Sequence, residues 1–471
     1  MKYKVSDILE ATRGLLLSGS QTVSFKAIST DSRTIEEGDI FLALKGKNYD
    51  GHNFAEAAFK KGAYGLLIQM EYWKCMKEAI PPHVVTIGVS DTLKALGDIA
   101  AFERKRHPIR VVAITGSNGK TTVKEMTSSI LDRQYRVLKT LGNFNNLVGL
   151  PLTLLKLTPT HEIGVLEMGM NHFGEIRRLT EIARPDIGVI TNIQMAHVGN
   201  LGDIDGIMMA KGELFENMGE QGIAIINSDD ERVSRLGAAF KGKRITFGMT
   251  AQADVGAYQV ENRGIGGITF VLQALDKNLK IHLRSPGICN LYNALAAAAV
   301  AVALNIEAQA IKEGIESFRS LKMRMEVLEM PDGSRLINDA YNANPGSVAV
   351  ALKTLLDLKN NSRSIVVLGD MLELGDVSSS AHYNIGRFIA QSNIDHLMVM
   401  GDYADEVLKG AIEAGMSFKR LFKGNTHKDI YLRLKKTLKA GDWVLVKGSR
   451  NMHMEALIDE LTENWQITTE S

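Results

Sequence analysis

A β-branched run that leads directly into a glycine-containing loop constrains this chain more than any other feature of its sequence. Residues 109–115 read Ile-Arg-Val-Val-Ala-Ile-Thr, which is typical of a buried strand, and apolar residues recur at helical spacing from 123 to 131. Such a loop turns backbone N–H groups toward an anion, and the helix N-terminus adds positive potential. The sequence therefore predicts a phosphate-binding loop, which together with the first helical turn comprises Gly116, Ser117, Asn118, Gly119, Lys120, Thr121 and Thr122.

The residues around this loop fit a nucleotide ligand. Lys120 is placed to reach the β- and γ-phosphates, and the hydroxyl of Thr121 is placed to bind Mg²⁺. The usual phosphate-loop spacing has a glycine where this chain has Ile114, and Gly116 opens the loop two residues later. Because a strand precedes the loop and a helix follows it, we interpret the segment as an ATP site. The glycine-rich run at 264–267 lacks such a frame, and we interpret it as a β-turn.

The charge balance excludes function classes that depend on a strongly charged surface. The 471 residues include 55 Lys and Arg and 54 Asp and Glu, which gives a formal net charge of +1. This balance predicts no nucleic-acid partner, so an anionic ligand must be held by a local arrangement. The length predicts about three domains of ~100–200 residues each.

Cysteine usage and hydropathy predict the compartment. The chain has 2 cysteines, Cys75 and Cys289, which are too few for a disulfide framework, and we expect both to be buried in a reducing environment. The N-terminus lacks the apolar run of a signal peptide. The alanine-rich stretch at 293–304 is shorter than the ~20 residues that span a bilayer, and it predicts a closely packed helix. We expect a cytoplasmic monomer that does not insert into a membrane.

Hydrophobic periodicity predicts an α/β fold in the first two thirds of the chain. Before about residue 90, short apolar runs alternate with amphipathic segments and glycine turns, and residues 91–106 are typical of a connecting helix. Further apolar runs at 109–115, 163–167 and 186–191 alternate with helical patterns. This alternation favours a parallel sheet with helices on both faces.

The last section repeats the same theme. Apolar runs at 364–369, 396–401 and 442–447 are separated by helical segments. We therefore predict three α/β domains, which are a smaller N-terminal domain at 1–90, a central P-loop domain with a parallel sheet at 91–317, and a C-terminal Rossmann-like domain at 318–471.

Polar residues follow several of the predicted strands. Glu167 ends the run at 163–167, and His197 follows the run at 186–191. Ligands bind at the carboxyl ends of parallel strands, so we expect both side chains at the edge that carries the phosphate loop, where they would help to hold Mg²⁺. Asp339 ends another predicted strand before an Asn/Pro/Gly turn, which suits ligand contact. Lys211 lies on a predicted helix, where physical reasoning alone favours a solvated lysine.

These segments together resemble the Mur ligases, ATP-dependent amide-forming enzymes of peptidoglycan synthesis, over essentially the whole chain. The loop at 115–122 is similar to the family's ATP loop, displaced glycine included. The resemblance implies that Lys211 is carbamylated by CO₂, which turns a cation into an anionic oxygen ligand. It implies catalytic roles for Lys120, Glu167, His197 and Lys211, and a Mg²⁺ site made by Thr121, Glu167, His197 and Lys211.

The same resemblance implies two further sets of residues. Besides the phosphate loop, the ATP-binding residues would be Asn290, Asn293, Arg324 and Asp339, and the family usually has His where this chain has Cys289. The implied substrate-binding residues are Asp31, Ser32, Arg33, Asp50, Gly51, His52, Asn145, Asn146, Asn342 and Asn344.

Segments at 142–153, 341–345 and 368–375 resemble one branch of the family. They imply that the chain joins D-alanyl-D-alanine to UDP-N-acetylmuramoyl-tripeptide through an acyl phosphate, with either diaminopimelate or lysine as the third peptide residue. The alternatives are another Mur-type ligase that adds an amino acid to a UDP-muramoyl peptide, a polyglutamate-adding relative, or a P-loop ATPase switch. Only the first interpretation predicts ADP release that depends on D-alanyl-D-alanine.

Overall fold

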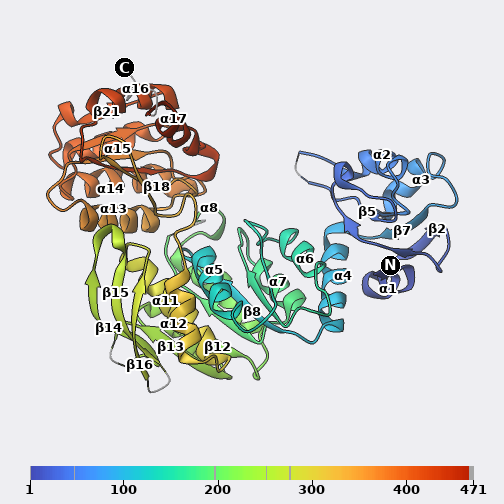
Figure 1. Cartoon of the computed structure of the whole chain (residues 1–471). Coiled ribbons are helices and arrows are strands. Elements are labelled where there is room, and N and C mark those ends of the chain that lie inside the picture. The colour runs from blue at the N-terminus through green and yellow to red at the C-terminus, as the bar shows by residue number, and fades with distance from the viewer. Residues whose placement is uncertain (1, 47, 196–197, 251, 275–276, 466–471) are drawn as a thin grey trace. The chain divides into compact units, whose positions relative to one another are not determined.

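The computed structural model describes residues 2–46, 48–195, 198–250, 252–274 and 277–465, which fold as an α/β protein (Figure 1). The chain forms two compact units. The first comprises Met1–Val111, Arg136–Met168 and Arg177–Pro185, and the second comprises Val112–Tyr135, Gly169–Ile176 and Asp186–Ser471.

The N-terminal part of the first unit is built on a five-stranded sheet. Its elements are β1 (Tyr3–Lys4), α1 (Val5–Thr12), β2 (Leu15–Ser18), β3 (Ser24–Phe25), β4 (Ile28–Ser29), β5 (Ile40–Leu42), α2 (Ala55–Lys60), β6 (Gly65–Gln69), α3 (Trp73–Met76) and β7 (Val85–Val89). The strand order is β2-β7-β6-β5-β4, with β4 to β7 parallel and β2 antiparallel to β7. Alternate residues of a strand point to opposite faces, so Phe41, Leu66 and Ile68 share one core with Ala55 and Ala58 of α2.

The predicted connecting helix is confirmed as α4 (Thr92–Arg106). The side chain of Asp91 accepts the N–H of Lys94 and caps this helix. Near its other end, the buried Arg104 donates from Nε to the carbonyl of Ala183 at 3.0 Å, which ties α4 to the end of α7 (Glu175–Ala183). The first unit also contains β9 (Val137–Lys139), α6 (Gly149–Leu154) and β10 (Ile163–Glu167).

A nine-stranded sheet is formed within residues 110–283. Its other strands are β8 (Arg110–Thr115), β11 (Ile187–Ile190), β12 (Ile223–Asn227), β13 (Lys243–Gly248), β14 (Val255–Asn262), β15 (Ile268–Ala274) and β16 (Lys277–Leu283). The order is β16-β15-β14-β13-β12-β11-β8-β10-β9. β8, β11, β12, β13 and β14 pair in parallel, whereas β14, β15 and β16 pair antiparallel.

The predicted parallel sheet is present in β8 and β11 to β14, and one edge of the sheet is antiparallel. The run at 264–267 forms the short turn between β14 and β15, and a link of this length can join only antiparallel strands. The sheet is mixed because this hairpin and β16 extend the parallel part.

Helices cover the strands of the second unit. Its central elements include α5 (Lys120–Leu131), α8 (Val198–Leu201), α9 (Ile204–Asn217), α10 (Glu231–Ala239), α11 (Ile288–Ala303) and α12 (Ala308–Ser317). The alanine-rich stretch lies in α11, most of whose side chains are buried. The helix contacts α5 and the strands β13 to β15. Small alanine side chains allow this close approach, so the prediction of a closely packed helix is confirmed.

The C-terminal part of the second unit is a six-stranded sheet with the order β17-β18-β22-β19-β20-β21. All of its neighbouring strands are parallel except β17, which pairs antiparallel with β18. The predicted runs at 364–369, 396–401 and 442–447 form β19, β20 and β22. The elements are β17 (Glu326–Glu329), β18 (Arg335–Asp339), α13 (Pro345–Lys359), β19 (Ser364–Leu368), α14 (Ser378–Gln391), β20 (His396–Val399), α15 (Ala404–Glu413), β21 (Leu421–Lys423), α16 (His427–Thr437), β22 (Trp443–Lys447) and α17 (Glu455–Trp465).

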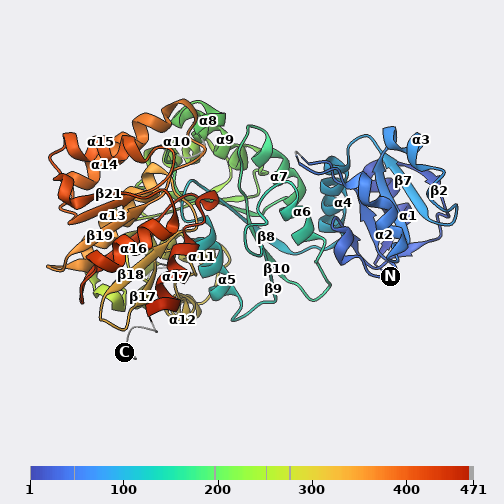
Figure 2. The same cartoon turned by 90° about the horizontal axis from the view of Figure 1, so that it is seen from above.

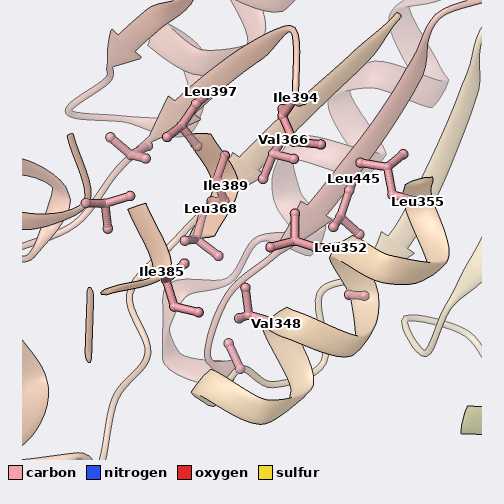
Figure 3. Packing of buried hydrophobic residues seen from close by; sticks show 14 of the residues in the cluster. Val348, Leu352, Leu355, Val366, Leu368, Ile385, Ile389, Ile394, Leu397 and Leu445 are labelled. Carbon is pink, nitrogen blue, oxygen red and sulfur yellow. The ribbon is translucent and has the colours of Figure 1, made fainter. Parts of the chain in front are cut away.

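The two faces of this sheet carry separate cores. Val366, Leu368, Leu397 and Leu445 pack with residues of α13 and α14, such as Leu352, as Figure 3 shows. The alternate residues of the same strands, including Ile365, Val367, Val444 and Val446, pack with α16 and α17. Figure 2 shows α14 and α15 on one side of the strands and α16 and α17 on the other, which is the doubly wound arrangement predicted for this part.

Among the described residues, no helix combines the length and the apolar character that crossing a bilayer requires. The expectation that both cysteines are buried is wrong for Cys75, which is exposed because it lies on the short surface helix α3. Cys289 is partly buried, and burial, followed by the Asp339 carboxylate, raises the pKa of its thiol to about 12.

Candidate active site

The predicted phosphate loop joins β8 to α5, and its two glycines are required by backbone shape and by space. Gly116 and Gly119 have φ angles of 144° and 85°, which side-chain-bearing residues rarely adopt. A Cβ at Gly116 would lie 1.9 Å from Oγ1 of Thr191. A Cβ at Gly119 would lie 2.4 Å from Oδ1 of Asn293. Side chains of neighbouring segments therefore pack against the loop backbone at both glycines.

A polar segment after β11 holds the backbone of this loop. Oγ1 of Thr191 donates to the carbonyl of Asn118 at 2.6 Å, and the N–H of Asn118 donates to Oδ1 of Asn192 at 2.9 Å. Oγ of Ser117 donates to the carbonyl of Gln194 at 2.9 Å. Sequence reasoning missed Thr191, Asn192 and Gln194, although polar residues directly after a buried parallel strand were a usable signal.

Lys120 stands in the first turn of α5, above the loop. Its Nζ donates to the carbonyl of Gly116 at 2.8 Å and to that of Ser117 at 3.3 Å. Thr121 and Thr122 follow in the same turn and are largely buried. The structure thus brings the predicted loop residues together in one cradle at a helix N-terminus, where N–H groups and the helix dipole favour an anion.

Two asparagines of α11 lie beside the cradle. Asn290 is held by the protein, since its Nδ2 donates to Oγ of Ser285 at 2.8 Å and to the carbonyl of Pro286 at 2.7 Å. Its Oδ1 accepts from Nδ2 of Asn293 at 3.2 Å. That bond turns Oδ1 of Asn293 toward Gly119, so Asn293 contacts the loop and Asn290 orients it.

Lys211 is buried on α9, with only 2% of its surface exposed. The expectation of a solvated lysine is therefore wrong, because α9 packs on both sides and buries Ile207, Ala210 and Leu214 as well. Burial, assisted by the positive charge of Lys120, lowers the pKa of Lys211 well below its ordinary value. A lysine in this setting readily becomes a neutral, nucleophilic amine.

Glu167 belongs to the first unit, where it ends β10 and is buried. Its N–H donates to Oγ1 of Thr140 at 3.0 Å, and its Oε1 accepts from Nδ2 of Asn145 at 2.8 Å. The predicted residues Asn145 and Glu167 are thus in contact. Oδ1 of Asn146 instead accepts the N–H groups of residues 148 and 149 at the start of α6.

The predicted metal site includes a residue that the structure does not describe. His197 lies outside the described residues. Within the part of the chain that is described, no group of three or more His, Cys, Asp or Glu side chains is arranged to hold a metal ion. The Mg²⁺ assignments to Thr121, Glu167, His197 and Lys211 stay predictions.

Comparison with known proteins identifies the family. The Mur ligase middle domain matches residues 114–301, the Mur ligase glutamate ligase domain matches 323–450, and the Mur ligase family catalytic domain matches 24–104. A UDP-N-acetylmuramoyl-tripeptide--D-alanyl-D-alanine ligase of Bacillus subtilis is 35% identical over 468 residues, which cover 98% of this chain and 99% of the relative. The chain belongs to the Mur ligase family.

Further relatives of this Mur ligase support the same assignment. The ligase of that same name from Escherichia coli is 34% identical over 444 residues, 94% of this chain and 95% of the relative. A crystal structure of MurF from Acinetobacter baumannii superposes with a TM-score of 0.89 at 34% identity, covering 98% and 99% of the two chains. MurF ligase from Thermotoga maritima in complex with ADP gives a TM-score of 0.83 at 27% identity, covering 94% and 98%. The fold class predicted from the sequence is confirmed.

The C-terminal part of this Mur ligase contains an ion pair, made by a buried lysine and a partly buried aspartate, that sequence reasoning missed. Asp339 ends β18, and its Oδ1 accepts the N–H of Met325 at 3.1 Å. Its Oδ2 accepts from the ammonium of Lys447, which also donates to the carbonyl of Asn342 at 2.8 Å. Lys447 ends β22, and β18 and β22 pair in parallel with Asp339 opposite Lys447. A charged residue that ends an apolar run was the available signal.

Two other predicted residues of the C-terminal part contact neighbouring side chains. The guanidinium of Arg324 lies 3.8 Å from the ring centre of Tyr341, within the range of a cation–π interaction. Asn344 caps α13 and donates from Nδ2 to Oδ1 of Asn118 in the phosphate loop at 2.9 Å. The structure therefore connects the Asn342–Asn344 segment to the nucleotide cradle.

The predicted substrate residues of the N-terminal part form two local clusters. Asp31 precedes Ser32 and accepts the N–H of Arg33 at 2.9 Å, and hydrogen bonds from Arg33 lower the pKa of Asp31 to about 2. The guanidinium of Arg33 projects into solvent. This cluster presents a cation and a carboxylate at the surface.

The second cluster is centred on His52. Its Nε2 accepts the N–H of Gln69 at 2.9 Å, so its Nδ1 carries the proton that it shares with Asp50 at 2.6 Å. Partial burial acts to raise the pKa of Asp50, but hydrogen bonds from Tyr72 and His52 lower it to about 2. A Cβ on Gly51 would lie 2.7 Å from the carbonyl of Leu44, so this turn also requires glycine.

Proposed function

We propose that this Mur ligase uses ATP to join D-alanyl-D-alanine to UDP-N-acetylmuramoyl-tripeptide, giving the pentapeptide precursor of peptidoglycan, ADP and phosphate. The observation that carries the proposal is similarity over nearly the full length to ligases named for this reaction, at 35% and 34% identity. The preformed phosphate cradle at Gly116–Lys120 supports the use of ATP. A cytoplasmic location and a monomeric state belong to the same proposal.

The chemistry requires activation of a carboxylate. A carboxylate carbon is a poor electrophile, so the γ-phosphoryl group of ATP is transferred to the tripeptide carboxylate, and ADP leaves. The amine of D-alanyl-D-alanine then attacks the acyl carbon, the C–O bond to phosphate breaks, and the ammonium loses a proton as the amide forms. Positioning and neutralisation of charge dominate such a transfer.

Residues of the phosphate loop are suited to holding and neutralising the phosphates of ATP. Lys120 lies over the carbonyls of Gly116 and Ser117, where its ammonium is directed into the cradle. The loop N–H groups and the start of α5 add positive potential for the phosphates. Because residues after β11 hold the loop backbone, this potential exists before the ligand arrives.

The chemical nature of the proposed donors suits Mg²⁺ once Lys211 is modified. The Thr121 hydroxyl and the Glu167 carboxylate are the hard oxygen donors that Mg²⁺ prefers, whereas an amine is not. The lowered pKa of Lys211 favours the neutral amine, which bonds to the carbon of CO₂ and releases one proton to leave an anionic carbamate. We assign Thr121, Glu167, His197 and carbamylated Lys211 to the metal. Bound Mg²⁺ would neutralise charge on the phosphoryl group.

Asn290, Asn293, Arg324 and Asp339 complete the proposed ATP site, with Asn293 acting beside Gly119 and Asp339 held by Lys447. The proposed substrate residues are Asp31, Ser32, Arg33, Asp50, Gly51, His52, Asn145, Asn146, Asn342 and Asn344.

An acceptor panel tests the proposed function. The protein is supplied with ATP, Mg²⁺ and UDP-N-acetylmuramoyl-tripeptide. Parallel reactions then receive D-alanyl-D-alanine, glutamate or another single amino acid. ADP release that rises only with the dipeptide supports the proposal. Release that rises with a single amino acid assigns another Mur-type reaction, and release with no covalent product assigns an ATPase switch.

A further inference from the structure

Three side-chain amides connect the phosphate loop to the C-terminal part of the chain. Nδ2 of Asn344 donates to Oδ1 of Asn118 at 2.9 Å, and Nδ2 of Asn118 donates to Oε1 of Gln194 at 2.7 Å. Oδ1 of Asn344 accepts the N–H of Ser347 at 2.8 Å and caps α13. Because the cap needs an oxygen, Asn344 must present its NH₂ group to Asn118. The helix cap therefore sets the direction of the whole amide chain.

Gly346 makes room for this arrangement. A Cβ on Gly346 would lie 2.3 Å from Oε1 of Gln194 and 3.0 Å from its Cδ. The φ angle of Gly346 is not in the left-handed region, and alanine is the better helix former in a first turn, so only the space requires glycine. Farther along α13, a Cβ on Gly287 would lie 2.8 Å from Oγ1 of Thr354. α13 thus lies against the nucleotide-binding part at two points.

We infer that Asn118, Gln194, Asn344 and Gly346 form an amide joint that positions α13 and the preceding residues 339–344 against the phosphate loop. The joint places the second substrate so that its amine reaches the acyl phosphate. This role deepens the proposed function and rests on it. Gln194 and Gly346 act through their neighbours and are positioning residues.

The side-chain hydrogen bonds of the amide joint can be removed without removing those that hold the backbone of the phosphate loop. Thr191 and Asn192 hold the carbonyl and the N–H of Asn118, independently of its side chain. Loosening the side-chain amides therefore leaves the loop backbone in place. Formation of the acyl phosphate should continue, while attack by the amine should slow.

The kinetic test compares Gln194→Ala, Gly346→Ala and the double variant with the parent. The control is Gly219→Ala, since a Cβ at Gly219 meets nothing within 4 Å. With ATP and the UDP-tripeptide alone, single-turnover ADP formation should stay within about twofold of the parent for all variants. Amide formation should fall about tenfold in each single variant, as expected from the loss of one or two hydrogen bonds.

The double variant distinguishes a joint from two unrelated effects. Alanine at 194 lacks the Oε1 and Cδ atoms that a Cβ on Gly346 would meet at 2.3 and 3.0 Å and keeps only the Cβ at 3.2 Å, so Gly346→Ala should cost less in the Gln194→Ala background than in the parent. Effects that multiply instead, or an equal fall of both half-reactions, would overturn the inference. Thermal unfolding should show Gly346→Ala to be close to the parent in stability, because the helix propensity of alanine offsets the lost hydrogen bond of Gln194.

Hydrogen exchange supplies a test that does not depend on turnover. Adding ADP and Mg²⁺ should slow amide exchange across 345–359 in the parent and not in Gln194→Ala, because ordering of Asn118 is passed to the α13 cap. If ADP and Mg²⁺ do not slow hydrogen exchange in the parent, the joint is overturned, even when the parent makes the pentapeptide product. If exchange slows but the parent makes no pentapeptide product, the joint is supported and the proposed function is overturned.

Discussion

Replacing Gly119 by alanine tests the phosphate loop with a matched control elsewhere in the chain. Gly119 and Gly441, which lies in the turn before β22, have φ angles of 85° and 83°. Alanine therefore meets the same left-handed backbone at both positions, at a cost of about 1–2 kcal/mol. Only Gly119 is also crowded, since its Cβ would lie 2.4 Å from Oδ1 of Asn293, whereas nothing lies within 4 Å of a Cβ at Gly441.

The magnitudes follow from these contacts. Gly441→Ala should lower the free energy of unfolding by about 1–2 kcal/mol, which is the backbone term alone. Gly119→Ala displaces Asn293 from its hydrogen bond with Asn290, which adds roughly 1 kcal/mol and gives about 2–3 kcal/mol in total. Displacement of the cradle should also lower kcat/KM for ATP about a hundredfold, while Gly441→Ala stays within twofold.

Urea unfolding and phosphate release at limiting ATP measure the two quantities on the same samples. Stability that falls equally in both variants would show that crowding by Asn293 contributes nothing. A Gly119→Ala protein with the parent's kcat/KM for ATP would refute the assignment of this loop to the nucleotide.

The remaining predictions concern lysines. Lys120→Ala should abolish amide formation with the fold intact by circular dichroism, and retained turnover would remove the phosphate-clamp role. Lys211→Ala should lose activity and regain part of it with added short carboxylates, which replace carbamate oxygens. Acidification protonates the Lys211 amine and opposes its reaction with CO₂, whereas the burial that lowers its pKa keeps the amine neutral to lower pH. Depletion of CO₂ should therefore remove activity, and added bicarbonate should restore it more fully as pH rises; activity indifferent to CO₂ would contradict the carbamate. Lys447→Met removes the buried ammonium that pairs with the partly buried Asp339 and should lower the free energy of unfolding by about 3 kcal/mol in urea. Lys423→Met, which breaks an exposed pair, should cost under about 1 kcal/mol, and equal costs would contradict the burial argument.

Local signals explain why the nucleotide cradle was predictable. The β-branched run before Gly116 and the helical spacing after Lys120 depend only on residues adjacent in sequence. The carboxyl end of β10 was recognised for the same reason, since Glu167 directly follows an apolar run. Asn145 was assigned by resemblance alone, and its contact with Glu167 was found in the structure.

Non-local packing explains what the sequence left out. Burial of Lys211 depends on what covers both sides of α9, and the Asp339–Lys447 pair joins residues 108 positions apart. The strands β14 to β16 alternate buried and exposed residues only partly, so no strong period marked them. The amide chain through Gln194 needs three segments to meet, and no single segment carries its pattern.

The most direct test of the central claim is the stoichiometry of phosphate released to amide formed. The parent protein is incubated with ATP, Mg²⁺ and UDP-N-acetylmuramoyl-tripeptide, with and without D-alanyl-D-alanine, and the product is weighed by mass spectrometry. The account predicts one phosphate for each pentapeptide product and negligible steady-state release without the dipeptide. Sustained release without the dipeptide, or release with no product of the pentapeptide mass, would contradict it.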